Sequence, residues 1–299
     1  MSRLIDSILI PTDGSDGALE GAKHALALAS RTDADVHVLS VVAVRSDVDE
    51  SIDAPESVYA SLEAEAEDAV EAVASMARSH DADLEVTTTV TRGTPFQSIR
   101  EYATRRGIDV IAMGTKGRSG LDRVLLGSVT ENVLRTARTP VLAVPPNADA
   151  TEIDEVAFDE FLLPTDGSDG AAIATDWGIE LARRLGSTIH TVYSVDSSRL
   201  GVGEPADLLS ALEHRGEDAL DSVRQRAGDA GVSVSGALAT GSPTDVVLTT
   251  AAKREVDLIV MGTHGRTGIG QWFLGSVTEN VVRQADVPVF CVPVSTETP

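Results

Sequence analysis

The residues of this sequence best suited to chemistry lie in two glycine-rich segments, one in each half of the chain. The first reads GTKGRSG over residues 114–120 and is followed by Gly127-Ser128. The second reads GTHGRTG over residues 262–268 and is followed by Gly275-Ser276. Glycines let backbone N–H groups approach a ligand closely, and each segment runs into a predicted helix, whose N-terminal N–H groups and dipole favour an anion. We therefore expect a phosphate-binding site in each half.

The charge of the first segment supports the same interpretation. The formal net charge of the 299-residue chain is −23, so a cationic loop is unexpected in it. Within residues 114–127 the only acid stands among several cations, namely Asp122 with Lys116, Arg118 and Arg123. A bound phosphate would complement this charge; the alternative is that the arginines are simply solvated.

The residues that follow the glycines also match a helix-capping pattern. Ser128 with Glu131, and Ser276 with Glu279, have the spacing of a capping box. Such a box would stabilise the start of a helix while leaving other N–H groups for a phosphate, so the two interpretations are compatible.

An internal repeat indicates how the chain is organised. The heptapeptide PTDGSDG occurs at residues 11–17 and again at 164–170, and LGSVTENV occurs at 126–133 and again at 274–281. The same motifs therefore appear in the same order in each half. We expect two tandem domains, residues 1–146 and 156–296, with the linker between Pro145 and Val156.

Short β-branched runs alternate with helical stretches in each half, which is typical of parallel β-α-β units. In the first half we expect strands at residues 7–11, 36–42, 84–91, 108–113 and 139–144. We expect a helix at 16–31 capped by Asp16, a long helix from Val58 with Leu62 on its apolar face, and helices starting at Pro95 and Ser128. Right-handed crossovers then give a doubly wound α/β domain, with helices on both faces and the ligand at the carboxyl ends of the strands.

These motifs resemble the universal stress protein family, in its ATP-binding branch and its tandem two-domain form. The pattern G-x2-G-x9-G-[ST] of that branch is matched in both halves, by Gly114, Gly117, Gly127 and Ser128 and by Gly262, Gly265, Gly275 and Ser276. The triplet Pro-Thr-Asp at the end of the first strand is similar to the family pattern as well. The resemblance implies a five-stranded parallel sheet of order 3-2-1-4-5 in each domain, and ATP as the ligand, with or without magnesium or manganese.

The resemblance also implies which residues hold the nucleotide. In the first half these are Pro11, Thr12, Asp13 and Val41 at the adenosine end, Met113 and Gly114 beside the ribose, and Gly117, Arg118, Gly127, Ser128 and Val129 around the phosphates. In the second half the matching residues are Pro164, Thr165, Asp166, Ser194, Met261, Gly262, Gly265, Arg266, Gly275, Ser276 and Val277. Ser194 replaces Val41, and the loss of an apolar wall would weaken the second site. Asp13 and Asp166 could instead cap a turn, as Asp before Gly often does.

The first functional hypothesis is a binding module of the stress response. ATP would shift the protein between two conformations that engage different partners, and the sequence identifies no protein partner. The alternative is a slow ATPase or a nucleotidyl- or phosphoryl-transfer enzyme, which would need a positioned base and usually a metal. A scaffold without nucleotide would predict degraded glycine motifs, and both are intact. We assign no catalytic residue and no metal ligand.

Composition narrows the range of partners and locations. An evenly acidic surface repels nucleic acid and anionic lipid, and no run is long and apolar enough for a membrane span. We expect a cytoplasmic protein, adapted to concentrated salt as in a halophilic archaeon. We also expect the two domains to pair with pseudo-two-fold symmetry through their closing strands, Val141 to Val144 and Val289 to Val292, with further homo-oligomers left open.

Overall fold

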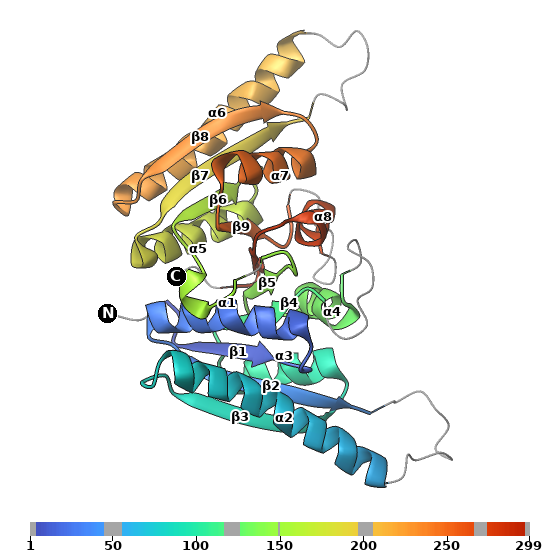
Figure 1. The fold of residues 1–299 in the computed structure, drawn as a ribbon. Coiled ribbons are helices and arrows are strands. Elements are labelled where there is room, and N and C mark those ends of the chain that lie inside the picture. The colour runs from blue at the N-terminus through green and yellow to red at the C-terminus, as the bar shows by residue number, and fades with distance from the viewer. Residues whose placement is uncertain are drawn as a thin grey trace, which may run out of the picture. The chain divides into compact units, whose positions relative to one another are not determined.

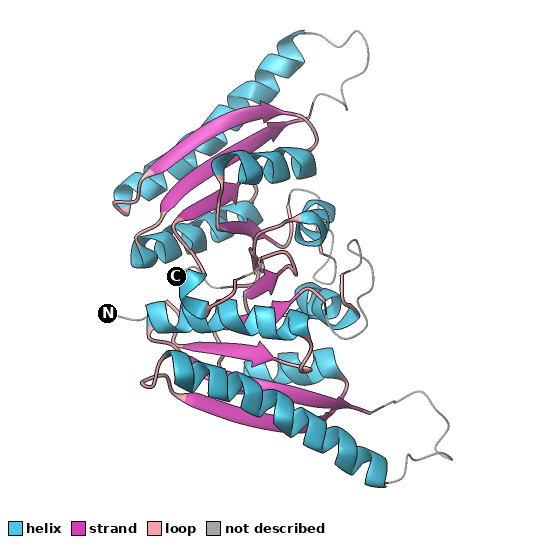
Figure 2. Ribbon diagram, viewed as in Figure 1, coloured by secondary structure: helices cyan, strands magenta, loops and turns pink. Residues whose placement is uncertain are grey.

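The computed structural model describes residues 4–44, 56–116, 126–148, 150–196, 206–265 and 274–296. The chain divides into two compact units, Met1–Val156 (unit 1) and Ala157–Pro299 (unit 2). Helices and strands alternate through each unit, as Figure 2 shows. None of the helices in the described part combines the length and the apolar character that crossing a bilayer requires.

Unit 1 contains a five-stranded parallel sheet. Its strands are β1 Ser7–Pro11, β2 Asp35–Ala43, β3 Val86–Gly93, β4 Val110–Gly114 and β5 Val141–Val144. Their order is β3-β2-β1-β4-β5, and all neighbours run parallel. Strands β4 and β5 are buried along their whole length, which explains why they consist almost entirely of apolar residues. The predicted fold class and strand order are confirmed.

Helices cover both faces of this sheet (Figure 1). They are α1 Asp16–Thr32, α2 Glu56–His80, α3 Pro95–Arg106 and α4 Ser128–Thr136. Helix α1 contacts α2, and α3 contacts α4, so each pair shares one face. The apolar side of α2 is narrower than predicted: Ala66, Ala69 and Val73 are buried, but Leu62 is 38% exposed.

Unit 2 repeats the architecture of unit 1 with its own sheet, in the order β8-β7-β6-β9-β10. The element that joins the two units in sequence is the short 3-10 helix η1, Ile153–Glu155, which belongs to unit 1. In chain order unit 2 contains β6 Glu160–Pro164, α5 Asp169–Leu185, β7 Thr188–Val195, α6 Ala206–Asp229, β8 Val234–Thr240, α7 Pro243–Arg254, β9 Leu258–Gly262, α8 Ser276–Gln284 and β10 Val289–Val292.

Two predictions about helix starts are wrong. Helix α1 is capped by Ser15, whose hydroxyl accepts the N–H of Ala18 at 3.3 Å, and not by Asp16. Gly127 is the N-cap of α4, so Ser128 is already inside the helix and forms no capping box. The predicted partner Glu131 pairs instead with Arg135 at 2.8 Å.

The same displacement by one residue occurs in unit 2. Gly275 is the N-cap of α8, and Glu279 pairs with Arg283 at 2.8 Å. A capping box requires the serine itself in the extended N-cap conformation, and here a glycine occupies that position. The start of each helix is therefore stabilised without a side-chain cap.

Candidate functional site

A cavity of about 290 Å³ opens at the carboxyl ends of β1, β2 and β4 in unit 1. Its lining includes every predicted site residue of the first half that lies in the described part of the chain. These residues are Pro11, Thr12, Asp13, Val41, Met113, Gly114, Gly127, Ser128 and Val129. The two remaining predictions, Gly117 and Arg118, lie outside the described residues.

The lining has two chemical characters. One part is apolar and includes Leu39, Val41 and Ala43 of β2 together with Ile99 of α3. The other part contains Lys116 and the first turn of α4, where glycine, hydroxyl and backbone N–H groups predominate. The cavity therefore offers an apolar surface and a cationic, amide-rich surface to one ligand.

Sequence reasoning missed part of the apolar lining. Leu39 and Ala43 lie two residues either side of Val41 on the same strand, and side chains two apart in a strand point to the same face. That periodicity could have identified both residues once Val41 was assigned. Ile99 gave no comparable signal, because only the packing of α3 brings it to the cavity.

The two ends of the first glycine-rich segment are held together by the backbone. The Thr115 N–H donates to Val144 O at 2.8 Å, and the Gly127 N–H donates to Thr115 O at 2.8 Å. The buried hydroxyl of Thr130 donates to Gly114 O at 2.8 Å. These bonds fix the first turn of α4 beside the end of β4, which is where the cavity lies.

Helix α1 packs on this region through two glycines. A Cβ built on Gly17 would lie 2.2 Å from Lys116 O, and one built on Gly21 would lie 2.5 Å from Gly114 N. Any larger residue at either position would collide with backbone atoms. The sequence pattern indicates ligand approach for the glycines near residue 114, and this packing role depends on tertiary contacts that the pattern does not contain.

Asp13 caps the turn that enters α1. Its Oδ1 accepts the Ser15 N–H at 3.0 Å and the Ser15 hydroxyl at 2.5 Å, while Gly14 has a positive φ of 74°. Asp166 makes the same two bonds with Ser168, at 3.0 and 2.5 Å. The turn-capping interpretation is thus correct for both residues. It leaves room for a ligand contact, since a carboxylate accepts several hydrogen bonds.

Unit 2 has the same backbone scaffold around its predicted site. The Gly275 N–H donates to Thr263 O at 2.8 Å, and the Thr278 hydroxyl donates to Gly262 O at 2.8 Å. Gly265 lies against Asp166, because a Cβ on it would be 2.8 Å from Asp166 Oδ2. The other predicted residues stand at strand ends or in the first turn of α8, namely Pro164, Thr165, Ser194, Met261, Ser276 and Val277, whereas Arg266 lies outside the described residues.

Three of the positions at which unit 2 differs from unit 1 change polarity or charge. Ser194 takes the place of Val41, and its hydroxyl donates to Gly241 O at 2.7 Å. His264 takes the place of Lys116, with its Nδ1 3.0 Å from the Thr263 hydroxyl. The Nε2 of His264 is buried and has no hydrogen-bond partner among the described residues. Burial lowers the pKa of His264, so this position of unit 2 does not supply the ammonium charge that Lys116 supplies in unit 1. Thirdly, Asp196 stands where unit 1 has Ala43.

A separate cavity of unit 2 lies beside the loop that follows β6. It measures about 550 Å³, and its lining comes from α5 and α6 together with the loop after β6. Thr165 and Ser168 line it, as do Arg215 and Arg226 of α6. Sequence reasoning gave no indication of this cavity, because it depends on how α6 packs beside α5.

Comparisons of the sequence and of the fold with known proteins all find universal stress proteins. The profile of the universal stress protein family matches residues 5–145 and 157–293. The chain is 40% identical over 146 residues to a universal stress protein of Methanocaldococcus jannaschii, an alignment that covers 47% of this chain and 82% of that protein. It is 29% identical over 213 residues to one of Mycobacterium tuberculosis, covering 70% and 69%. A solved universal stress protein structure from Archaeoglobus fulgidus has the same fold, with a TM-score of 0.72, 23% identity and coverage of 97% and 98%.

Proposed function

Because this chain belongs to the universal stress protein family, we propose that it is an ATP-binding regulatory protein of the stress response. The observation that carries this proposal is the cavity of unit 1, which joins an apolar surface to a cationic surface at the tip of α4. An adenine ring attached to a polyphosphate has the same two chemical characters. Ligand sites commonly combine an apolar lining with a few convergent polar groups in this way.

The phosphate end of the proposed site is the first turn of α4. The opening N–H groups of a helix have no acceptor within the helix, and they carry the positive end of its dipole. Ser128 and Val129 belong to that turn and line the cavity, and the Lys116 ammonium can neutralise phosphate charge. Gly127 lies beside them in the lining, where a Cβ would come within 3.1 Å of Thr115 O.

The base end of the proposed site is the wall formed by β2 and α3. Val41 and Ala43 present small apolar groups there, and Met113 adds a polarisable side chain at the end of β4. A purine ring buried against these groups gains from leaving water. Unit 2 would hold the nucleotide in the same way but more weakly, because Ser194 and His264 replace Val41 and Lys116.

A magnesium or manganese ion would be held mainly by the nucleotide. Among the described residues there is no group of three or more His, Cys, Asp or Glu side chains that could hold a metal. Asp13 is the carboxylate in the lining of the unit 1 cavity, and its Oδ1 already accepts two hydrogen bonds from Ser15. These residues fit an ion that is carried by phosphate oxygens with at most one protein carboxylate, which is common for magnesium. The ion would screen phosphate charge.

Regulation would follow from a difference in ATP affinity between two conformations of the protein. A ligand shifts a conformational equilibrium only by the ratio of its affinities for the two states. The end of β4 and the first turn of α4, which line the cavity, are the elements that ATP would contact in the favoured conformation. The alternative function, slow hydrolysis or group transfer, makes a different prediction for turnover.

The test is to measure binding and turnover on the same purified chain. Calorimetry with ATP should show saturable binding, and incubation with ATP and magnesium or manganese should leave the bound nucleotide intact. Sustained release of ADP over many turnovers would favour the alternative enzyme function. Absence of binding to the wild-type chain would overturn the proposal.

A matched pair of variants can locate the binding. Ser128→Asp places a negative charge at the proposed phosphate position, yet an acid in the first turn of a helix is stabilising. Ser276→Asp makes the same change in unit 2. We expect Ser128→Asp to remove the tighter site and Ser276→Asp the weaker one, with thermal stability unchanged or slightly increased in both.

A further inference from the structure

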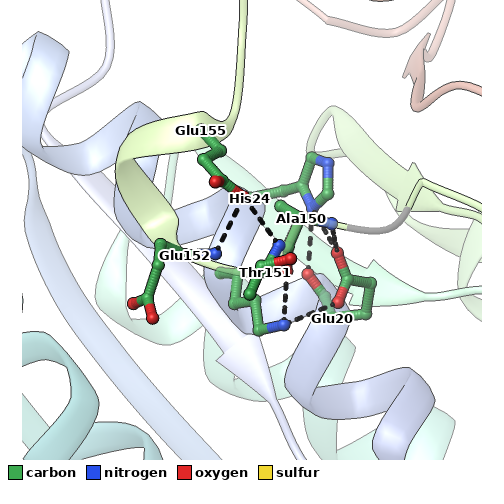
Figure 3. A network of polar contacts seen from close by, with 7 residues as sticks. Glu20, His24, Ala150, Thr151, Glu152 and Glu155 are labelled. Atoms are coloured by element: carbon green, nitrogen blue, oxygen red, sulfur yellow. Dashed lines mark hydrogen bonds and ion pairs between the residues drawn. The ribbon is translucent and has the colours of Figure 1, made fainter.

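A short segment after β5 is bound to α1 by a buried polar network (Figure 3). The Ala150 N–H donates to Glu20 Oε1 at 3.0 Å, and the Lys23 ammonium donates to Ala150 O at 2.6 Å. Lys23 Nζ also lies 3.1 Å from Glu20 Oε2, which closes the ring of contacts. Both backbone groups of Ala150 are thus held by side chains of one helix.

Most residues of this network are buried, so each of their polar groups needs a hydrogen-bond or ion-pair partner. Glu20 is 8% exposed, Ala150 is 7% exposed and His24 is 5% exposed. A carboxylate in such a place is stable only when its oxygens are hydrogen-bonded or ion-paired. His24 supports the network from the next turn, where its Nδ1 donates to Glu20 O at 3.0 Å. Burial lowers the pKa of His24, so the imidazole is neutral and Lys23 is the cation of the group.

The rest of the segment is attached to unit 1 as well. The Arg31 guanidinium donates to Val156 O at 2.8 Å, and His80 Nδ1 lies 3.3 Å from Asp154 Oδ1. Ile153 and Val156 are buried. Residues 150–156, which the sequence indicated as part of a linker, are therefore docked along α1 and the end of α2.

The same helix also contacts the glycine-rich segment of the cavity. Gly17 and Gly21 pack against the backbone of Lys116 and Gly114, one turn or less from Glu20. The strand that leads into the docked segment is tied to the cavity too, since Val144 O accepts the Thr115 N–H at 2.8 Å. Only a few residues separate Val144 from Ala150. Val144 is bonded to Thr115, which lies between two residues of the cavity lining, and Ala150 is bonded to α1.

Unit 2 shows that the fold does not require this network. At the positions of Glu20, Lys23 and His24, unit 2 has Ile173, Asp176 and Trp177. Asp176 pairs with Arg226 at 2.7 Å, and the Trp177 ring packs 6.1 Å from that of Phe290. The Glu20 network is therefore a specific feature of unit 1. It holds the segment that precedes unit 2 in the sequence.

We propose that Glu20 is a positioning residue that couples occupancy of the unit 1 cavity to the docking of residues 150–156 on α1. A ligand that contacts Lys116 and the first turn of α4 fixes the backbone against which Gly17 and Gly21 pack. Helix α1 then holds Ala150 through Glu20 and Lys23 in its docked position. This inference rests on the proposed binding of ATP. It assigns residues 150–156 as the segment that responds to occupancy of the unit 1 cavity.

Coupling of this kind is reciprocal. If ATP stabilises the docked segment by some factor, then docking must raise ATP affinity by the same factor. Glu20→Ala removes the acceptor of the Ala150 N–H and the ion pair with Lys23, and it should therefore weaken ATP binding, by about fivefold for a coupling at the low end of the usual range. A merely structural role for Glu20 would lower stability without linking these two quantities.

The experiment is hydrogen exchange of the full chain with and without saturating ATP. In the wild type, ATP should slow exchange of the amides in residues 150–156 by about fivefold. In Glu20→Ala these amides should exchange faster, and ATP should no longer slow them. Glu20→Gln should fall between the two, because its carbonyl still accepts the Ala150 N–H. Asp176→Asn is the matched control in unit 2 and should leave the exchange of residues 150–156 unchanged.

The outcomes separate this inference from the proposed function. Binding of ATP by calorimetry, with wild-type exchange of residues 150–156 unaffected, would overturn the coupling and leave ATP binding intact. Persistence of the ATP effect in Glu20→Ala would overturn the role of Glu20. Absence of any ATP binding by the wild type would overturn the proposed function and the coupling with it. Should Glu20→Ala fail to fold by circular dichroism, Lys23→Met keeps the apolar stem, removes the bond to Ala150 O and carries the same prediction.

Discussion

Gly114 and Gly17 approach each other so closely that a Cβ built on Gly114 would lie 2.0 Å from the main-chain oxygen of Gly17. One glycine ends the buried strand β4 and the other lies in the first turn of α1, so two motifs far apart in sequence meet backbone to backbone. Glycine at residue 114 therefore has a packing role, whatever it contributes to ligand binding. This contact places α1 against the wall of the cavity.

Substitution of Gly114 should test that contact. Gly114→Ala forces backbone atoms apart, and we expect it to destabilise unit 1 by about 1–3 kcal/mol, as overpacking usually does. Thermal unfolding would show this as a lower transition temperature. Gly228→Ala is the control, since a Cβ there meets nothing within 4 Å and alanine favours a helix. Equal transition temperatures for Gly114→Ala and the wild type would contradict the packing role.

Exchange of the residues at the base end should change the relative affinity of the two sites. Val41→Ser removes apolar surface from the cavity and should weaken ATP binding in unit 1 by about 1 kcal/mol, or roughly fivefold in Kd. Calorimetry of the variant against the wild type measures this directly. An unchanged Kd would show that the base does not lie against Val41.

The reverse exchange in unit 2 carries an additional cost. Ser194→Val adds apolar surface but leaves Gly241 O without the hydroxyl that donates to it at 2.7 Å. We expect tighter ATP binding in unit 2 together with a loss of stability of about 1 kcal/mol. A gain in stability, measured by thermal unfolding, would contradict the importance of that hydrogen bond.

The cap of α1 should contribute to stability. Ser15→Ala removes the hydroxyl that accepts the Ala18 N–H and donates to Asp13. Loss of an N-cap of this type costs about 1 kcal/mol. Ser168→Ala in unit 2 removes the same two bonds and should show a similar loss by thermal unfolding. Replacement of Asp16, which the sequence favoured as the cap, by Asn should have a much smaller effect.

Stability should fall as the pH drops below about 6.5. Burial lowers the pKa of His24, His37 and His264 in the folded chain, and Arg106 adds to this effect at His37. The unfolded chain therefore binds more protons than the folded chain in this range, and stability decreases as protons are added. The effect begins near the ordinary histidine pKa of 6.5 and is complete below the lowered values.

The histidine effect can be isolated by a substitution. His24→Gln keeps a side-chain donor but cannot titrate, so its transition temperature should fall less than that of the wild type between pH 7 and pH 5. Glu63 and Glu180, whose pKa values are lowered from 4.5 by arginine hydrogen bonds, act only at lower pH and do not interfere. Identical pH dependence in the two proteins would contradict this assignment.

Much of the fold and of the site could be predicted from the sequence, for physical reasons. Parallel β-α-β units bring the carboxyl ends of their strands to one edge of the sheet, so motifs at 11–14 and after Met113 had to meet there. Because the motifs recur in the second half, the same prediction holds for both halves. The position of the site follows from the topology of the sheet and not from side-chain detail, so it could be predicted from the sequence.

The predictions that failed depend on single positions or on tertiary packing. A shift of one residue moved Ser128 from the N-cap into the helix and removed the capping box. Glu20 and His24 are polar residues of a helix and gave no signal in the sequence, yet both are buried beside the docked segment, with Lys23 partly buried next to them. No local pattern shows that Ala150 will lie beside these residues, because the contact joins residues far apart in the chain.

We propose above that the cavity of unit 1 binds ATP with its phosphates at the first turn of α4. A crystal structure of the full chain grown with excess ATP tests this most directly. We expect the adenine to lie against Val41 and the phosphates beside Gly127, Ser128 and Val129, with Lys116 close to them. A well-ordered cavity that stays without nucleotide under these conditions, or a nucleotide bound elsewhere, would contradict it.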